Sequence, residues 1–365
     1  MKSIFGTASA ILSMIPVLAF GQTFRLVEPA SPYTEVGLYS VSHDGRTTAG
    51  ATSGSTHFVG MVDRPEARTT FDGPSDGLHS NVLGLSATGD YSAGWSLQAN
   101  TPTEQAFRRD SAGNYVNIPR LRTNHTFNWA LGISASGSRV VGYSGRGQDA
   151  AERNEAFLWD ETTGLQSLGF LSPNGVMSRA NAISADGLTV VGFSVSEFLG
   201  NNSEGFVWTA ASGMTRLFYP NGAAATGFVD VSASGRFVIG GGYRWDSGVP
   251  LSIGLLPGQS QQTMKAMSDD GRVIVGTAGN ALSERAYIWT ESEGIQFLQD
   301  YLLGIGTQVP TGWRLSEATA ISGDGSTITG SAYDLAGVRH AFVATIPAPG
   351  SVVVVGLAAL PRRRR

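Results

Sequence analysis

Ile183-Ser184-Ala185-Asp186-Gly187 is one copy of a phrase that occurs seven times in this chain of 365 residues. Each copy reads apolar residue, Ser, any residue, then Asp, Ser or Thr, then Gly. The turn glycines are separated by 44, 48, 50, 48, 36 and 54 residues. A repeat period of about 20–50 residues is typical of solenoids, propellers and arrays. The other six copies begin at Val41, Leu85, Ile133, Val231, Met267 and Ile321.

Each repeat unit reads as four short strands, which the clearest copy shows well. Residues 179–183 read as a strand, and Asp186-Gly187 forms a tight turn because glycine tolerates a positive φ. A β-branched strand returns over residues 188–193, and two more strands follow within residues 205–218. Four antiparallel strands per unit are typical of a propeller blade. We therefore predict an all-β fold, a seven-bladed β-propeller formed by residues 22–346.

The ends of the repeat region predict how the ring closes. The last unit lacks a fourth strand, whereas residues 24–27 precede the first unit without belonging to one. Proteins tend to cover exposed strand edges. We predict that residues 24–27 pair antiparallel with residues 341–345, so that an N-terminal strand completes the last blade. Apolar residues at helical spacing also predict a short helix around residues 297–303.

The residue two positions before each repeated Ser is very small in six of the seven copies. The innermost strands of a propeller crowd towards the central axis, so we predict that this strand is the innermost one. Asp230 is the exception, and we predict that it faces the central channel.

No motif in the sequence predicts a catalytic residue. A nucleophile is needed once, with a base beside it, whereas seven equivalent Ser residues favour a turn-capping role. The turn Asp residues lack the close spacing of a calcium loop, and the five His residues form no zinc motif. We predict no catalytic residue, no bound metal and no cofactor.

The residues best suited to binding lie in the variable loops between the second and third strands of the units. Long connections on one face of a repeat protein are common binding loops. Two functions stay open: a non-catalytic binding or structural module for an extracellular polysaccharide or a surface protein, and an enzyme acting on polysaccharide, a lyase or glycosidase with convergent carboxylates at the channel. The candidate binding residues are Arg146, Arg153, Asn154, Asn201, Asn202 and Asp230.

The two ends of the chain carry export signals by pattern. Residues 1–21 have the charge, apolar run and small residues of a secretory signal peptide. Residues 347–365 hold a Pro-rich motif, a short apolar run and an Arg cluster, and the run is too short to span a bilayer. The net charge of −4 does not indicate the basic surface that nucleic-acid binding requires. The lack of cysteine excludes disulfides. The motif and cluster are Pro347, Ala348, Pro349, Gly350, Arg362, Arg363, Arg364 and Arg365.

This C-terminal segment resembles the PEP-CTERM sorting signal. The resemblance implies an exosortase-type processing protease and the secretion machinery as partners, and only transient contact with the membrane. It also implies a secreted protein at the cell-envelope surface, or in the extracellular matrix, of a Gram-negative-type bacterium. The repeats, with His340-Ala341-Phe342 and the Ala-Phe-Leu-Trp of residues 156–159, resemble the extracellular HAF repeat, which implies a surface location and no particular chemistry.

Overall fold

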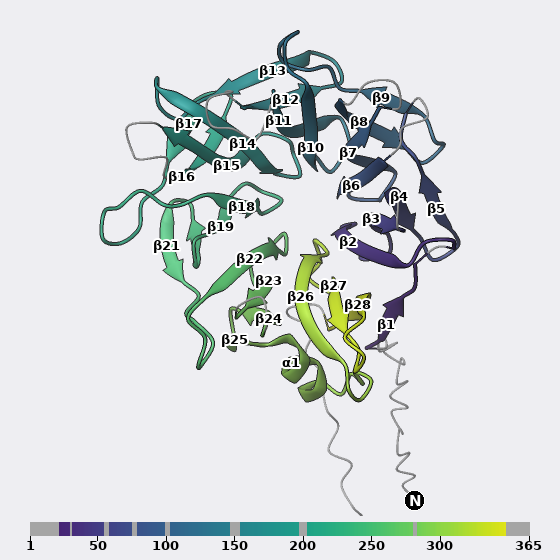
Figure 1. The fold of residues 1–365 in the computed structure, drawn as a ribbon. Helices are drawn as coiled ribbons and strands as arrows, with labels where there is room; N and C mark the ends of the chain where they lie inside the picture. Colours follow the sequence, from purple (N-terminus) through teal and green to yellow (C-terminus); the bar gives the residue numbers. More distant parts are fainter. Residues whose placement is uncertain are drawn as a thin grey trace, which may run out of the picture.

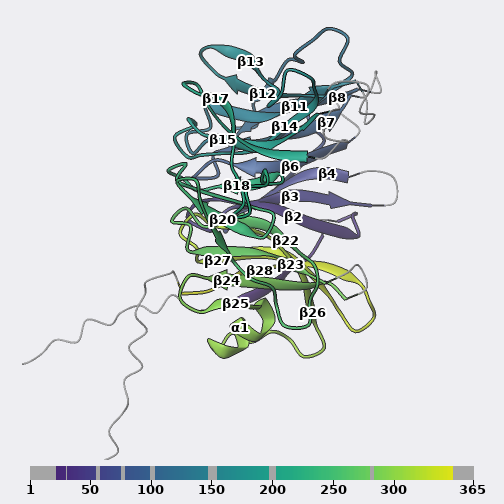
Figure 2. The same cartoon turned by 90° about the vertical axis from the view of Figure 1, so that its left-hand side faces the viewer.

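The computed structural model describes residues 22–29, 31–54, 58–74, 79–98, 103–146, 154–196, 203–279 and 283–347. The chain forms a ring of antiparallel sheets that radiate from a central axis (Figure 1). The first strand of each repeat unit lies nearest the axis, as predicted, and the edge-on view shows a disc (Figure 2). The fold is therefore an all-β β-propeller.

Five sheets have four strands each and stand alone. The first contains β2 (Glu35–Val41), β3 (Thr48–Ser53), β4 (Phe58–Asp63) and β5 (Arg68–Phe71). The second contains β14 (Gly175–Ile183), β15 (Val190–Ser196), β16 (Ser203–Thr209) and β17 (Gly213–Arg216). The third contains β18 (Phe228–Val231), β19 (Phe237–Gly240), β20 (Tyr243–Asp246) and β21 (Val249–Ser252). The fourth contains β22 (Gln262–Met267), β23 (Val273–Ala278), β24 (Arg285–Thr290) and β25 (Gly294–Phe297). The fifth contains β26 (Arg314–Ile321), β27 (Thr327–Tyr333), β28 (Arg339–Thr345) and β1 (Phe24–Val27).

The remaining eight strands form one continuous sheet, so the prediction of seven separate four-stranded blades is wrong. Strands β8 and β10 are joined by one parallel pair, Phe127 with Glu104. Side chains hold them together, because Trp129 Nε1 donates to Glu104 Oε2 at 2.6 Å and the Ala106 amide donates to Asn128 Oδ1 at 3.0 Å. The strands are β6 (His79–Leu85), β7 (Tyr91–Leu97), β8 (Glu104–Asp110), β9 (Tyr115–Asn117), β10 (Phe127–Ile133), β11 (Arg139–Gly145), β12 (Glu155–Asp160) and β13 (Gly164–Gly169).

The N-terminal strand closes the ring as predicted. Strand β1 pairs antiparallel with β28, with Phe24 opposite Ala344 and Val27 opposite Ala341. Phe24 stacks on Phe342 with ring centroids 5.6 Å apart. The pairing covers the outer edge of the last sheet, and Val27 is buried in the cluster shared with the first sheet.

The predicted helix is also present. Helix α1 (Leu298–Gly304) follows β25 and buries Leu298 and Leu302. These side chains pack with β24 and β26 in the largest apolar cluster, which joins the last two sheets. The long spacing before the seventh repeat therefore accommodates a helix against the edge of the disc.

The repeated Ser residues cap their own turns. Each is at most 1 % exposed, and each hydroxyl accepts a hydrogen bond from the amide five residues later, as Ser184 does from Thr189 at 3.0 Å. The same bond recurs for Ser42, Ser86, Ser134, Ser232, Ser268 and Ser322. The turns lie on one side of the disc, which we call the turn face; the opposite side, where β2 begins and β3 ends, is the loop face.

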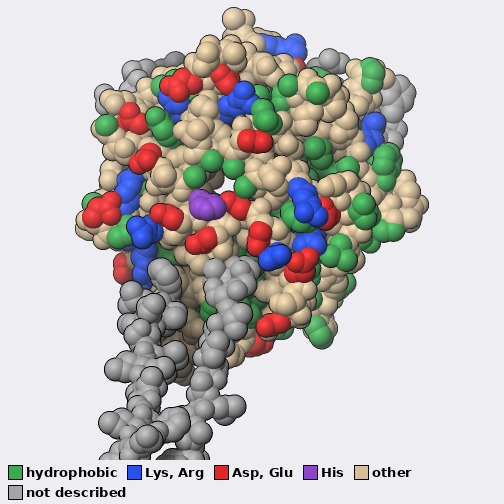
Figure 3. Space-filling view, turned by 180° about the vertical axis from the view of Figure 1, so that it is seen from behind, with side chains coloured by type: hydrophobic (Ala, Val, Ile, Leu, Met, Phe, Trp, Pro, Cys, Tyr) green, Lys and Arg blue, Asp and Glu red, His purple; other side chains and the backbone are tan. Residues whose placement is uncertain are grey.

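Backbone hydrogen bonds connect successive turns around the axis on the turn face. The His43 amide donates to Ala87 O at 2.9 Å, and the same bond continues to Ala135, Ala185 and Ala233. Figure 3 shows this face, with a histidine and several carboxylates near its centre. The described ends of the chain also lie here, because the Thr345 amide donates to Thr23 O and Ile346 donates to Ser326 O.

Candidate functional site

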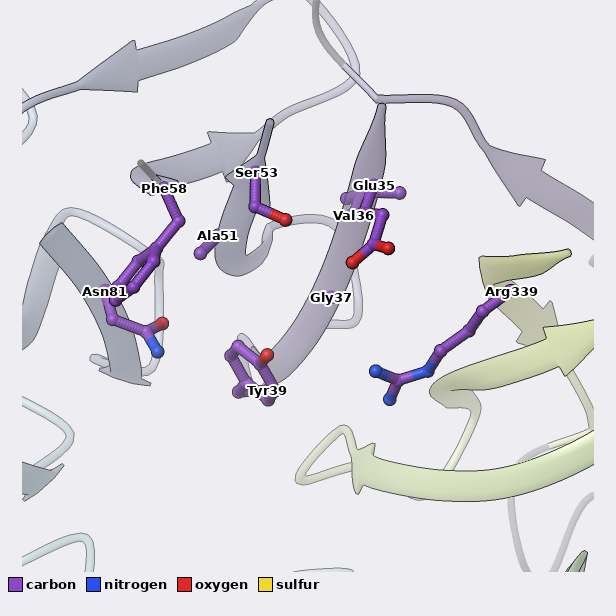
Figure 4. A pocket seen from close by; sticks show the side chains of 9 residues that line it. All are labelled: Glu35, Val36, Gly37, Tyr39, Ala51, Ser53, Phe58, Asn81 and Arg339. Atoms are coloured by element: carbon purple, nitrogen blue, oxygen red, sulfur yellow. The ribbon is translucent and has the colours of Figure 1, made fainter. Parts of the chain in front are cut away.

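A polar pocket opens on the loop face between the first and last sheets. It encloses about 170 Å³, and its walls combine charged, amide, hydroxyl and aromatic groups. Arg339 reaches in from β28 towards Tyr39 on the inner strand β2, and Asn81 and Phe58 lie side by side on the far wall (Figure 4). The lining residues are Glu35, Val36, Gly37, Tyr39, Ala51, Ser53, Phe58, Asn81 and Arg339.

Three charged side chains form an ion-pair network beside this pocket. Glu317 lies on the inner strand β26 and pairs with two cations. Its Oε1 is 2.8 Å from Lys265 Nζ, and its Oε2 is 3.5 Å from Arg339 Nη2. Arg339 also donates to Ser331 Oγ at 2.7 Å. We call Tyr39, Lys265, Glu317 and Arg339 the charged cluster.

Tyr39 belongs to this cluster through its electrostatics. Burial raises the pKa of its phenol above the usual value; Arg339 opposes the rise, while Glu317 and Glu35 add to it. Tyr39 as a residue is 38 % exposed, and its phenol stays protonated at neutral pH. Tyr39 can therefore donate a hydrogen bond to a ligand in the pocket.

An aromatic cluster continues from the other wall of the pocket. The Phe58 ring meets Trp95 edge-on at 5.6 Å, and Trp95 stacks on Trp129 at 4.9 Å with only 7° between the ring planes. Trp129 contacts Tyr143 at 5.8 Å, and the Arg179 guanidinium lies 5.0 Å above the Tyr143 ring. We call Phe58, Trp95, Trp129 and Tyr143 the aromatic cluster; it runs across three repeat units on the loop face.

Asn81 connects the two clusters. It lies on the inner strand β6 opposite Trp95, and its amide points towards Tyr39 (Figure 4). Its Oδ1 is shielded from solvent and has no hydrogen-bond partner in the described part of the chain. A buried acceptor without a partner costs about 1–3 kcal/mol, so a ligand hydroxyl or amide donor would be well placed there.

The loop residues predicted from the sequence contribute little to this pocket. Arg146 is exposed at the end of β11, and its carbonyl accepts Thr126 Oγ1 at 2.7 Å. Asn154 is 3 % exposed, and its amide oxygen lies against Gly145. Arg153, Asn201 and Asn202 lie outside the described residues.

The Asp230 carboxyl group connects two neighbouring sheets through hydrogen bonds. Its Oδ1 accepts the Val231 amide and its Oδ2 accepts the Met267 amide of the next inner strand, both at 2.8 Å. Burial raises the pKa of its carboxyl from 3.8 to about 7, although the two amide donors oppose this shift. Both oxygens are thus occupied by backbone groups.

The inner-strand residues that form the site were not predicted from the sequence. The prediction for the inner strands rested on the position two before each repeated Ser, whereas Asn81, Trp129 and Glu317 lie five before it and Tyr39 lies three before it. The alternation of side chains along a strand is the pattern that points to these positions, because every second residue of an inner strand faces the same side. Of the predicted sorting residues, Pro347 is described, whereas Ala348, Pro349, Gly350 and Arg362 to Arg365 lie outside the described residues.

Within the described residues, no three His, Cys, Asp or Glu side chains come together in a way that could hold a metal ion. None of the described segments is a helix long and apolar enough to cross a bilayer.

No protein-family model matches this chain, and no curated protein matches it. Solved structures do resemble it. An oligogalacturonate lyase in complex with manganese is 14 % identical, with a TM-score of 0.56, over 89 % of this chain and 96 % of its own. The oligogalacturonate lyase from Vibrio parahaemolyticus is 13 % identical, with a TM-score of 0.53, over 89 % and 97 %.

The β-propeller domain of the Trilobed protease from Pyrococcus furiosus, described as having an open velcro topology, is 9 % identical, with a TM-score of 0.53. That match covers 86 % of this chain and 95 % of the domain. At such low identities these similarities concern the fold alone. They place the chain in the class of β-propellers.

Proposed function

We propose that this chain is an exported, non-catalytic β-propeller that binds an extracellular polysaccharide on its loop face. The observation that carries the proposal is the pocket between the first and last sheets. There Asn81 Oδ1, beside Tyr39, Arg339 and the Phe58 ring, has no hydrogen-bond partner among the described residues. Sugars present hydroxyl groups along their edges and apolar C–H faces. A pocket with an aromatic wall and convergent hydrogen-bonding groups suits them.

The repeat architecture supports a binding role. We count the eight-stranded sheet as two fused blades, because it holds two complete repeat turns, so that seven units surround the channel. We assign these units to a β-propeller of the HAF-repeat type. Its scaffold recurs, while the pocket residues differ from unit to unit.

Export and sorting belong to the same proposal. Residues 1–21 act as a signal peptide, and residues 347–365 are removed by an exosortase-type protease that delivers the protein to the cell surface. Because both described chain ends lie at the turn face, attachment through the C-terminus would leave the loop face pointing outwards. The test is the intact mass of the protein purified from its native host. We expect a mature chain that begins near Gln22 and ends near Pro349, and retention of the Arg cluster would contradict the sorting proposal.

A glycan array probed with the secreted protein tests binding. Phe58→Ala and Asn81→Ala should each weaken the strongest signal about fivefold or more, since one hydrogen bond or ring contact contributes about 1 kcal/mol. Phe218→Ala is the matched control, because Phe218 is 52 % exposed and does not line the pocket. Absence of glycan binding, or an equal loss in the control, would contradict the proposal and favour a protein partner.

One observation favours a second candidate, an enzyme that acts on polysaccharide. Glu35 lines the pocket, and Glu317 pairs with Arg339, which lines it too, so two carboxylates belong to this site. Glycoside hydrolysis requires a pair of carboxylates about 5–9 Å apart. Release of reducing ends from a bound polysaccharide, abolished by either Glu35→Gln or Glu317→Gln, would establish the enzyme; binding without any cleavage supports the module.

A further inference from the structure

We propose that the site has a second subsite on the sixth repeat unit, and that the two together take one neutral, hydroxyl-rich oligosaccharide. This inference rests on the proposed function, which it extends from a pocket to a ligand class and a minimum length. It is carried by a second pocket, by buried groups without partners and by the balance of charge.

The second pocket adjoins the charged cluster on the fourth and fifth sheets. It encloses about 260 Å³, and Glu317 and Lys265 lie in its wall. The other oxygen of Glu317 contacts Arg339, which lines the first pocket. One carboxylate therefore separates the two pockets, and a ligand that fills both must have at least two rings. The remaining lining residues are Gln261, Gln262, Thr263, Thr277, Gly279 and Glu284.

Two side chains in this second pocket have polar atoms without partners among the described residues. Thr277 is 8 % exposed, and its hydroxyl makes no hydrogen bond. Gln262 Oε1 is also unpaired, and its orientation is fixed because Nε2 donates to Gly254 O at 2.6 Å. The register pairs Gln262 with Ala278 and Thr263 with Thr277, so the two side chains lie on opposite faces of the sheet and each offers its own group, an amide oxygen or a hydroxyl, to a sugar.

The charges exclude an acidic sugar. Among the described residues that line the pockets, two are cations, Lys265 and Arg339, and both contact Glu317. Glu35 and Glu284 add two further carboxylates to the walls, so the lining carries a net negative charge. A carboxylate or sulfate is bound most strongly by a cation that is free to pair with it. A neutral ligand avoids this repulsion and can use the unpaired hydroxyl and amide groups.

Calorimetry with defined probes tests the inference. The probes are neutral glucan, galactan, mannan and xylan oligomers of one to six units, and oligogalacturonates of the same lengths. For the best neutral series, affinity should rise at least tenfold from one unit to four. Thr277→Val should weaken the longer oligomers about fivefold and leave the shortest unchanged, while Thr215→Val, on the outer strand β17, should change neither.

Glu317→Gln provides the test of charge. It keeps the shape of the side chain but removes its charge from between Lys265 and Arg339. The variant should gain affinity for oligogalacturonate that the parent lacks. A single sugar unit binding as tightly as a hexamer would overturn the second subsite, and tighter binding of oligogalacturonate by the parent would overturn neutrality. If no oligosaccharide binds at all, the proposed function itself fails.

Discussion

His43 Nδ1 lies 2.5 Å from Asp269 Oδ2, although the two residues are 226 positions apart. They occupy the same position in the first and sixth repeat turns, and the turn between them, the seventh, has Gly323 there. Asp269 donates its amide to Gly323 O at 2.9 Å, and His43 O accepts the Asp324 amide at 3.2 Å. The pair thus spans the seventh unit on the turn face, where the ring closes.

Gly323→Ala should destabilise the protein because a Cβ there would overlap both His43 Nδ1 and Asp269 Oδ2. We expect a loss of about 1–3 kcal/mol in the free energy of unfolding, the usual range for overpacking. In a His43→Ala, Asp269→Ala background the same change should cost much less. Denaturant unfolding of the parent, the Gly323→Ala variant, the double variant and the triple variant measures these free energies. An equal loss in both backgrounds would show that the destabilisation does not come from overlap with His43 and Asp269.

Removing the contacts of the closing strand should weaken the whole ring. Val27 is 1 % exposed, so Val27→Ala should cost about 2 kcal/mol, and deletion of residues 22–28 should cost more. Arg25→Ala on the same strand is the control, since Arg25 is half exposed and its ion pair with Asp63 contributes under about 1 kcal/mol. Thermal unfolding checks this; an unchanged transition after the deletion would contradict closure by β1.

Asp230 should make the protein less stable as the pH rises. Burial raises its pKa in the folded chain to about 7, from 3.8. Between these values the folded state holds a proton that the unfolded state has released, so stability falls from about pH 4 to pH 7, by at most about 4 kcal/mol. Asp230→Asn should remove this part of the slope.

Urea unfolding at pH 5 and pH 8 measures the effect of Asp230→Asn. Relative to the parent, the free energy of unfolding of the variant should be higher at pH 8 than at pH 5. Asp90→Asn, an exposed carboxylate on the turn face, serves as the control. Identical pH slopes for parent and variant would show that the Asp230 carboxyl titrates normally.

The repeated Ser residues should affect stability and not binding. Ser184→Ala leaves the buried Thr189 amide without its acceptor, which costs about 1–3 kcal/mol. Ser212→Ala, at an exposed turn, should change the free energy of unfolding by less than about 0.5 kcal/mol. Loss of glycan binding in a Ser184→Ala protein that remains folded would contradict the scaffold role.

The fold could be predicted because its determinants are local and repeated. Each Ser turn sets a hairpin, and seven copies at a near-constant period leave few architectures. The closing strand was predictable from an unpaired edge. The fusion of two units was not, because it depends on side-chain contacts such as Trp129 with Glu104, which join residues from different repeats.

The site was much less predictable than the fold. The predicted binding residues were mostly in polar loops, whereas Tyr39, Asn81 and Glu317 lie on regular inner strands. They meet only because the ring brings the first, second and last units together. Such positions are visible in a sequence once the inner-strand register is counted from each repeated Ser, but which of them converge depends on the closed ring.

Hydrogen–deuterium exchange with the tightest-binding neutral oligosaccharide tests the central claim most directly. If the loop face is the binding surface, saturating ligand should slow exchange at Glu35–Val41 and at His79–Leu85, where the pocket lies. Exchange in the repeat turns, such as residues 42–47, should stay unchanged. Protection confined to the turn face, with none in those two strands, would contradict the account.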